Sequence, residues 1–136
     1  MNFFKNVILT FSMYLHLLCE IITCFYVFIF KKTYDLYFLI YFLIVLILKL
    51  KFKNECIWSV LDKRLINKNY KIGSNPAYQP FREIYGNKFI LNIIGLLILI
   101  EFFIIFFRNT NKLIKFIVIL DFLLLIVVEF NINKIK

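Results

Sequence analysis

Long stretches of apolar residues constrain this chain more than any other feature. Crossing about 30 Å of hydrocarbon takes about 20 helical residues. Three stretches approach this length, Val7–Phe30, Phe89–Phe107 and Leu113–Phe130. A fourth, Leu36–Leu48, spans only if it is extended to residues 34–52, with lysines at its end reaching the headgroups. Because 62% of the residues are hydrophobic, against about 45–50% in soluble domains, composition argues against a soluble globule.

The predicted spans are close enough along the chain to pair. Lys31–Asp35 and Arg108–Lys112 are short linkers, so the helices on either side of each should form an antiparallel hairpin. A long polar loop, residues 53–88, joins the hairpins. The predicted fold is therefore all-α: one transmembrane domain over residues 1–136, an antiparallel four-helix bundle with spans at about 7–30, 34–52, 89–107 and 113–130. A re-entrant or surface-lying segment is the alternative for 34–52.

Charge predicts how the chain is oriented. The net charge of +9 would suggest nucleic acid in a soluble protein, but Lys and Arg fall mostly between the apolar stretches, where they meet anionic lipid headgroups. With four spans, the termini and the central loop share one side, which holds twelve of the Lys and Arg residues, and the other side holds five. We therefore expect the termini and the basic central loop on the cytosolic side, and no nucleic acid partner.

The central loop contains a second helical pattern. Apolar residues recur at helical spacing just after the basic stretch, at Ile57, Trp58, Leu61 and Leu65. This pattern predicts a short amphipathic helix lying at the membrane interface, anchored by the only Trp.

Three polar residues share one face of this predicted helix, since Cys56, Ser59 and Asp62 are spaced i, i+3, i+6. They form either a catalytic or redox cluster, or a polar face held against headgroups and neighbouring loops. A nucleophilic Cys needs a base, and His16 is expected well inside the bilayer, so we favour the polar face. The three Cys lack paired metal spacing and the chain has one His, so no metal, cofactor or catalytic residue is predicted.

Four ionisable residues fall within the predicted spans. His16 and Glu20 are one turn apart on the first span, and Glu101 and Asp121 lie on the third and fourth. An acid in hydrocarbon costs about 2.5–3.5 kcal/mol on the insertion scale, so each should face the interior and find a partner. This polar cluster holds the helices in register, contacts a partner subunit, or relays protons or cations; we favour the first.

A resemblance adds to this. The run E-C-I-W-S-V-L-D-K at 55–63, followed by Y-K-I-G-S-N-P-A-Y-Q-P at 70–80, resembles small uncharacterised multi-spanning membrane proteins of giant DNA viruses. The loop is also similar to a bacterial four-helix membrane family with a Cys-x-x-Ser/Thr-x-x-Glu motif, but Asp62 replaces its Glu and Ile57 its usual Pro. The resemblance covers Ile29–Phe81. It implies a membrane location and a viral setting, and it transfers no catalytic residue.

These observations predict a non-enzymatic, multi-pass membrane protein of structural or assembly type, as a component of a viral membrane or of a membrane complex. Its expected partners are the lipid bilayer and other membrane subunits or a second copy of itself. One alternative is a proton- or cation-coupled channel or transporter that uses the midplane acids. Another is a small subunit of an organellar membrane complex, which fits the 14 Lys against 3 Arg expected of an A/T-rich genome.

Overall fold

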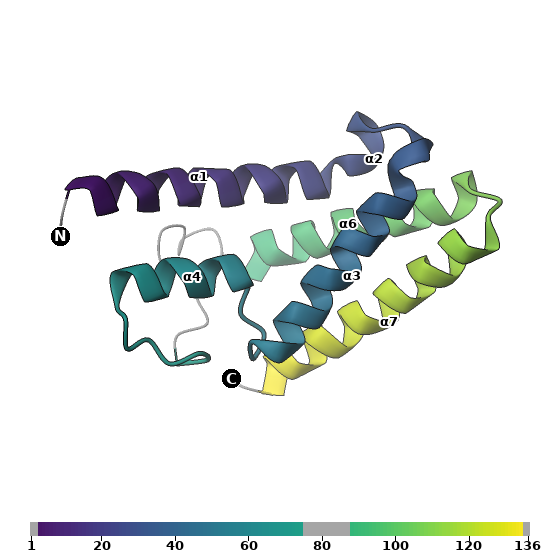
Figure 1. Cartoon of the computed structure of the whole chain (residues 1–136). Helices are drawn as coiled ribbons and strands as arrows, with labels where there is room; N and C mark the ends of the chain where they lie inside the picture. The colour runs from purple at the N-terminus through teal and green to yellow at the C-terminus, as the bar shows by residue number, and fades with distance from the viewer. Residues whose placement is uncertain (1–2, 75–87, 135–136) are drawn as a thin grey trace.

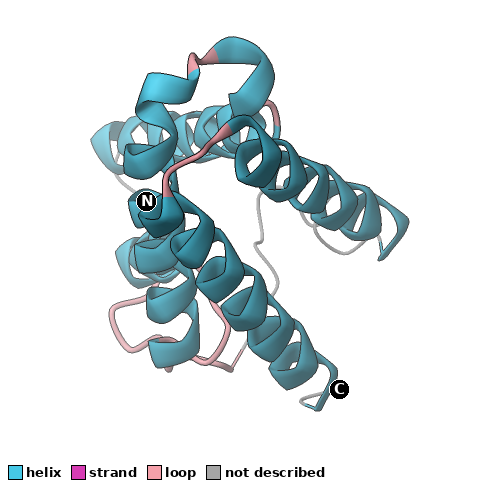
Figure 2. Cartoon of the chain, turned by 90° about the vertical axis from the view of Figure 1, so that its right-hand side faces the viewer, coloured by secondary structure: helices cyan, strands magenta, loops and turns pink. Residues whose placement is uncertain are grey.

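The computed structural model describes residues 3–74 and 88–134, and within these ranges every regular element is a helix. The all-α class predicted from the sequence is therefore confirmed. Short loops join consecutive helices from α1 to α4 and join α6 to α7 (Figure 2). In chain order the elements are α1 (Phe3–Cys24), α2 (Tyr26–Ile29), the 3-10 helix η1 (Lys32–Tyr34), α3 (Asp35–Lys51), α4 (Ile57–Ile66), α6 (Lys88–Arg108) and α7 (Lys112–Lys134) (Figure 1).

Three helices of the described chain are long and apolar enough to cross a membrane. They cover Phe3–Cys24, Lys32–Lys51 and Phe89–Arg108, and they correspond to the first three predicted spans. The segment expected at 34–52 is helical over almost the same residues. α7 is 23 residues long, but it carries Lys115, Asp121 and Glu129, and its crossing of a membrane stays a prediction.

The helices pack unevenly. α3 lies along α7, α7 also contacts α6, and α6 contacts α1 and α2 (Figure 1). Rings of Phe42 and Phe102 meet edge to face, with centroids 5.2 Å apart, where α3 meets α6. The buried apolar cluster consists of Tyr26, Phe38, Leu39, Phe42, Leu46, Phe102, Ile105, Ile114, Val118 and Val128.

α1 contributes no residue to this cluster. The two residues that it buries are His16 and Cys24. The packed core is thus built by α2, α3, α6 and α7, while α1 lies beside it and contacts α4 (Figure 1). A closed bundle of four equal helices, as predicted from the sequence, stays a prediction.

The first apolar stretch is broken where one continuous helix was expected. α1 ends at Cys24, and α2 begins two residues later, at Tyr26. Just before the break, the Thr23 hydroxyl donates a 2.7 Å hydrogen bond to the carbonyl of Cys19. Such a bond from a threonine to the carbonyl four residues earlier bends helices. The bend turns the chain toward α3 without a Gly or Pro.

The described part of the central loop is organised by one buried carboxylate. Glu55 accepts hydrogen bonds from Lys63 Nζ (3.2 Å), the Tyr70 hydroxyl (2.6 Å) and the Gly73 N–H (2.6 Å). Gly73 has a φ of +85°, which an L side chain rarely adopts. The carboxylate therefore ties residues 67–74 to α4, the short helix that the sequence predicted. Residues 75–87 of the predicted loop lie outside the described residues.

Neighbouring residues on α3 test this packing. Leu39 is fully buried and Ile40 is 43% exposed. We expect Leu39→Ala to lower the free energy of unfolding in mixed micelles by about 2 kcal/mol, which is the low end of the range for such a change. The loss is small because, in the unfolded state, the Leu39 side chain is surrounded by apolar chains and not by water. Ile40→Ala, the matched control, should change it by less than about 0.5 kcal/mol. Equal losses would contradict the described core.

Candidate functional site

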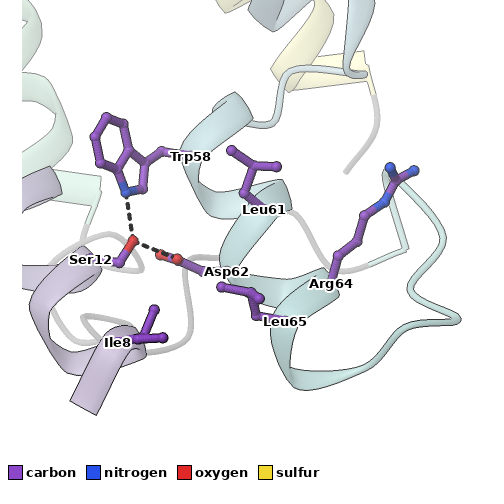
Figure 3. A pocket seen from close by; sticks show the side chains of 7 residues that line it. All are labelled: Ile8, Ser12, Trp58, Leu61, Asp62, Arg64 and Leu65. Atoms are coloured by element: carbon purple, nitrogen blue, oxygen red, sulfur yellow. Dashed lines mark hydrogen bonds between the residues drawn. The ribbon is translucent and has the colours of Figure 1, made fainter. Parts of the chain in front are cut away.

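α4 is held against α1 by a chain of side-chain hydrogen bonds. The indole Nε1–H of Trp58 donates to the Ser12 hydroxyl oxygen, and that hydroxyl donates to Asp62 Oδ1, each over 2.7 Å (Figure 3). Asp62 is buried. The face of α4 that the sequence assigned to headgroups or neighbouring loops therefore meets α1 at Asp62, and Ser59 on the same face is buried as well.

Next to this chain lies a cysteine–histidine pair. Sγ of Cys56 is 3.5 Å from Nε2 of His16, and the same nitrogen is 3.4 Å from Oε1 of Glu20. The imidazole also stacks on the Trp58 ring, with centroids 6.1 Å apart and planes 14° apart. The thiol and the carboxylate both lie at the same ring nitrogen, where the imidazole can take the thiol proton and Glu20 can then stabilise the imidazolium. We call Cys56, His16 and Glu20 the thiol cluster.

The structure brings His16 to Cys56, which the sequence-based interpretation kept apart. His16 lies in the middle part of α1, a helix long and apolar enough to cross a membrane. Its depth in a bilayer stays a prediction.

The surroundings favour the thiolate form of Cys56. Burial by itself would raise the pKa of the thiol, but the hydrogen bond to His16 and its charge lower it, and so do the backbone amides of Ser59 and Trp58. The net effect is a Cys56 pKa below the usual 9.0. Cys56 is the N-cap residue of α4, where the helix dipole favours negative charge. The residue is also partly exposed, so a reactant can reach it.

A groove of about 430 Å³ lies between α1 and α4 beside the thiol cluster. Trp58 belongs to both, since its ring stacks on His16 and also lines the groove. The groove is mostly apolar, with polar groups from Ser12, Asp62 and Arg64 (Figure 3). The complete lining is Ile8, Ser12, Trp58, Leu61, Asp62, Arg64 and Leu65.

A second polar site joins the two hairpins at the opposite end of the molecule. The fully buried carboxylate of Asp35 accepts hydrogen bonds from Arg108, through Nε at 2.8 Å and through a second guanidinium nitrogen. It also accepts from Asn109 Nδ2 (2.5 Å) and from the Tyr26 hydroxyl (3.1 Å). Arg108 donates in addition to the Val27 carbonyl over 3.3 Å. We call Tyr26, Asp35, Arg108 and Asn109 the hairpin latch.

Sequence analysis missed the hairpin latch. It identified Asp35 and Arg108 only as ends of the two short linkers. One signal was available, because an acid and a base stood in the two short linkers, which the predicted topology puts on the same side. Unlike charges at the same membrane level are expected to pair.

The four ionisable residues predicted as one intramembrane cluster have different surroundings. His16 and Glu20 belong to the thiol cluster, and Glu101 accepts from the Val27 N–H. Asp121 is fully buried, and neither of its carboxylate oxygens has a hydrogen-bond partner among the described residues. The second oxygen of Glu101 is in the same state within that part of the chain.

No group of three or more His, Cys, Asp or Glu side chains among residues 3–74 and 88–134 is placed to hold a metal ion. Comparisons of the chain with protein-family models, with curated proteins and with solved structures found no match. The function therefore has to be argued from the geometry of the chain itself.

The hairpin latch makes a direct prediction about stability. Asp35→Ala leaves the Arg108 charge without its carboxylate, and we expect a loss of about 3 kcal/mol in the free energy of unfolding, the low end for a broken buried pair, because the Arg108 side chain keeps 21% of its surface exposed. Lys32→Gln, an exposed residue in the same turn, is the control and should be neutral.

The paired variant sharpens this test. Asp35→Asn with Arg108→Gln removes both charges, so it should lose less than the sum of the two single changes. The hairpin latch would be contradicted if the double variant lost as much free energy of unfolding as the two single variants together. It would also be contradicted if Lys32→Gln lost as much as Asp35→Ala.

Proposed function

We propose that this chain is a small multi-pass membrane protein that acts as a structural or assembly component, in a viral membrane or in a membrane complex. The three apolar helices support a membrane location. The hairpin latch supports a structural use of polar groups, since its donors bond to one buried carboxylate and hold the two hairpins together. The basic loop, proposed to lie on the cytosolic side with the termini, would meet anionic headgroups.

One observation carries the assembly part of this proposal. Apolar side chains recur along α1 at alternating steps of three and four residues, and each of them is between 43% and 73% exposed. This spacing is the heptad seam with which one helix packs against another at a small crossing angle. We call it the α1 seam; it consists of Phe4, Val7, Phe11, Tyr14, Leu18 and Ile21, and Phe25, the residue just after the helix, continues the spacing.

No residue of the α1 seam belongs to the buried apolar cluster. α3 is shorter than α1 yet buries five residues, where α1 buries two. Van der Waals packing of helix against helix is the main attraction between spans in lipid. Because α1 adds no residue to the buried apolar cluster and carries this exposed run, its outer face is suited to a helix from another subunit or from a second copy.

Photo-crosslinking in the membrane tests the α1 seam. A photoreactive phenylalanine analogue at Phe11 or Leu18 should crosslink to a protein partner, because these positions lie on the seam. The comparison positions are Ile40 and Ile44 of α3, which are similarly exposed and lie on a shorter run of the same spacing. Because α3 already packs in the core of this chain, these positions should yield lipid adducts only.

The size of the crosslinked product separates a second copy, at twice the mass, from a different subunit. If the seam positions also yield lipid adducts only, the assembly proposal is wrong.

Transport is the second candidate function, and Asp121 is the observation that favours it. A fully buried carboxylate without a hydrogen-bond partner among the described residues is not acting as glue between helices. Intramembrane acids of this kind are characteristic of proton and cation pathways.

Flux measurements in liposomes decide this second candidate. If Asp121 carries protons or cations, the reconstituted chain should conduct, and Asp121→Asn should reduce the flux at least tenfold, while Glu129→Gln, an exposed acid on the same helix, should not. A wild-type flux no greater than that of empty liposomes would remove transport from consideration.

A further inference from the structure

We propose that Cys56 is an S-acylation site, at which the thiol takes a long-chain acyl group from an acyl thioester, with His16 as the base and Glu20 stabilising the imidazolium that forms. This modification goes beyond the assembly role, which does not require it. The proposal stands on the geometry of the thiol cluster and on its place beside an apolar groove.

The contacts of the thiol cluster distinguish Cys56 from the other cysteines. Nε2 of His16, the only histidine in the chain, is 3.5 Å from Cys56 Sγ. The carboxylate of Glu20 is 3.4 Å from the same nitrogen and stabilises the imidazolium once it forms. Cys19 and Cys24 are on α1, and Cys24 is buried there. Partial exposure, a nearby base and a helix N-terminus are the features of a reactive thiol.

The transfer step follows from these positions. His16 takes the proton of the Cys56 thiol, and the thiolate attacks the carbonyl carbon of the acyl thioester. A new bond forms between Sγ and that carbon, and the bond from the carbon to the leaving sulfur breaks. The leaving thiolate takes the proton from the His16 imidazolium. The products are acyl-Cys56 and a free thiol, so atoms and charge balance, and nothing is oxidised or reduced.

A buried hydroxyl is available for the carbonyl oxygen during attack. Ser59 lies three residues after Cys56 on α4, so one helical turn separates them. Its side chain is 3% exposed, and its hydroxyl has no hydrogen-bond partner among the described residues. A hydroxyl in that state gains a partner when a thioester carbonyl enters, which is how donors stabilise a developing oxyanion.

The surroundings favour an acyl chain over a small polar electrophile. The groove between α1 and α4 shares Trp58 with the thiol cluster and is lined by Ile8, Leu61 and Leu65. α4, whose N-cap is Cys56, is the amphipathic helix that the sequence predicts at the membrane interface. A Cys on an amphipathic helix at such a surface is the setting in which reversible S-acylation occurs. The acyl chain would fix α4 to the bilayer.

Other titratable side chains near Cys56 also affect how the thiol cluster responds to pH. Asp62 on α4 and Glu20 on α1 both act on His16 electrostatically. Tyr41 of α3 lies within electrostatic range of Cys56 and Glu20. The variants below leave all of them in place.

Acylation of the purified full-length protein in mild detergent tests the proposal. The probe is a long-chain acyl-coenzyme A thioester with a terminal alkyne, and the label that hydroxylamine releases is assigned to each cysteine by mass spectrometry. We expect Cys56 to be labelled on the order of tenfold faster than Cys19 or Cys24 at neutral pH, because only Cys56 has a base beside it. Cys56→Ser should remove most of the label, and Cys19→Ser should not.

His16→Asn separates the base from a merely structural histidine. It should slow labelling of Cys56 on the order of tenfold at neutral pH and leave Cys19 unchanged. Raising the pH toward the usual thiol range should restore the Cys56 rate, because the thiol then ionises without help. Equal labelling of the three cysteines in the wild type would overturn the proposal whether or not the variant folds. So would a Cys56 rate that His16→Asn leaves unchanged, or one that stays low at high pH.

Discussion

The absence of water in a hydrocarbon layer is the constraint from which the rest of the proposed account follows. Backbone groups in lipid must find their hydrogen bonds within the chain. A helix satisfies nearly all of its own backbone hydrogen bonds, which favours helices for the apolar stretches. Polar side chains obey the same requirement. Asp35 satisfies it with donors from Arg108, Asn109 and Tyr26, which come from both hairpins. One buried carboxylate thereby fixes how the two hairpins meet.

The two ends of the molecule use polar residues differently. At the turn end, the hairpin latch is closed, since the Asp35 carboxylate is fully buried and accepts from three side chains. At the loop end, α4 is tied to α1 through Ser12, Trp58 and Asp62, and this contact brings Cys56 to His16. The first arrangement gives stability and the second leaves a partly exposed thiol beside a base. Between them, the α1 seam offers its apolar side chains to lipid or to a partner helix.

The sequence predicts the local features of this structure, and it does not predict the contacts between residues that are far apart in the chain. The apolar helices and α4 are local, and hydropathy and helical spacing predicted them; the expected segment 34–52 is close to the observed Asp35–Lys51. The hairpin latch joins residues 73 apart, and the thiol cluster joins residues 40 apart. Neither pairing follows from spacing, because both depend on how helices settle against one another. The bend after Thr23 was missed for another reason, since it lacks the Gly or Pro that usually marks a break.

Extraction of membranes with alkaline carbonate tests the central claim most directly. This treatment opens vesicles and releases proteins held only by charge, while helices buried in hydrocarbon remain. If lipid is the solvent for α1, α3 and α6, the full-length chain stays in the membrane pellet and enters solution only when detergent is added. Recovery of the chain in the carbonate supernatant, or as a stable monomer in buffer without detergent, would contradict the account.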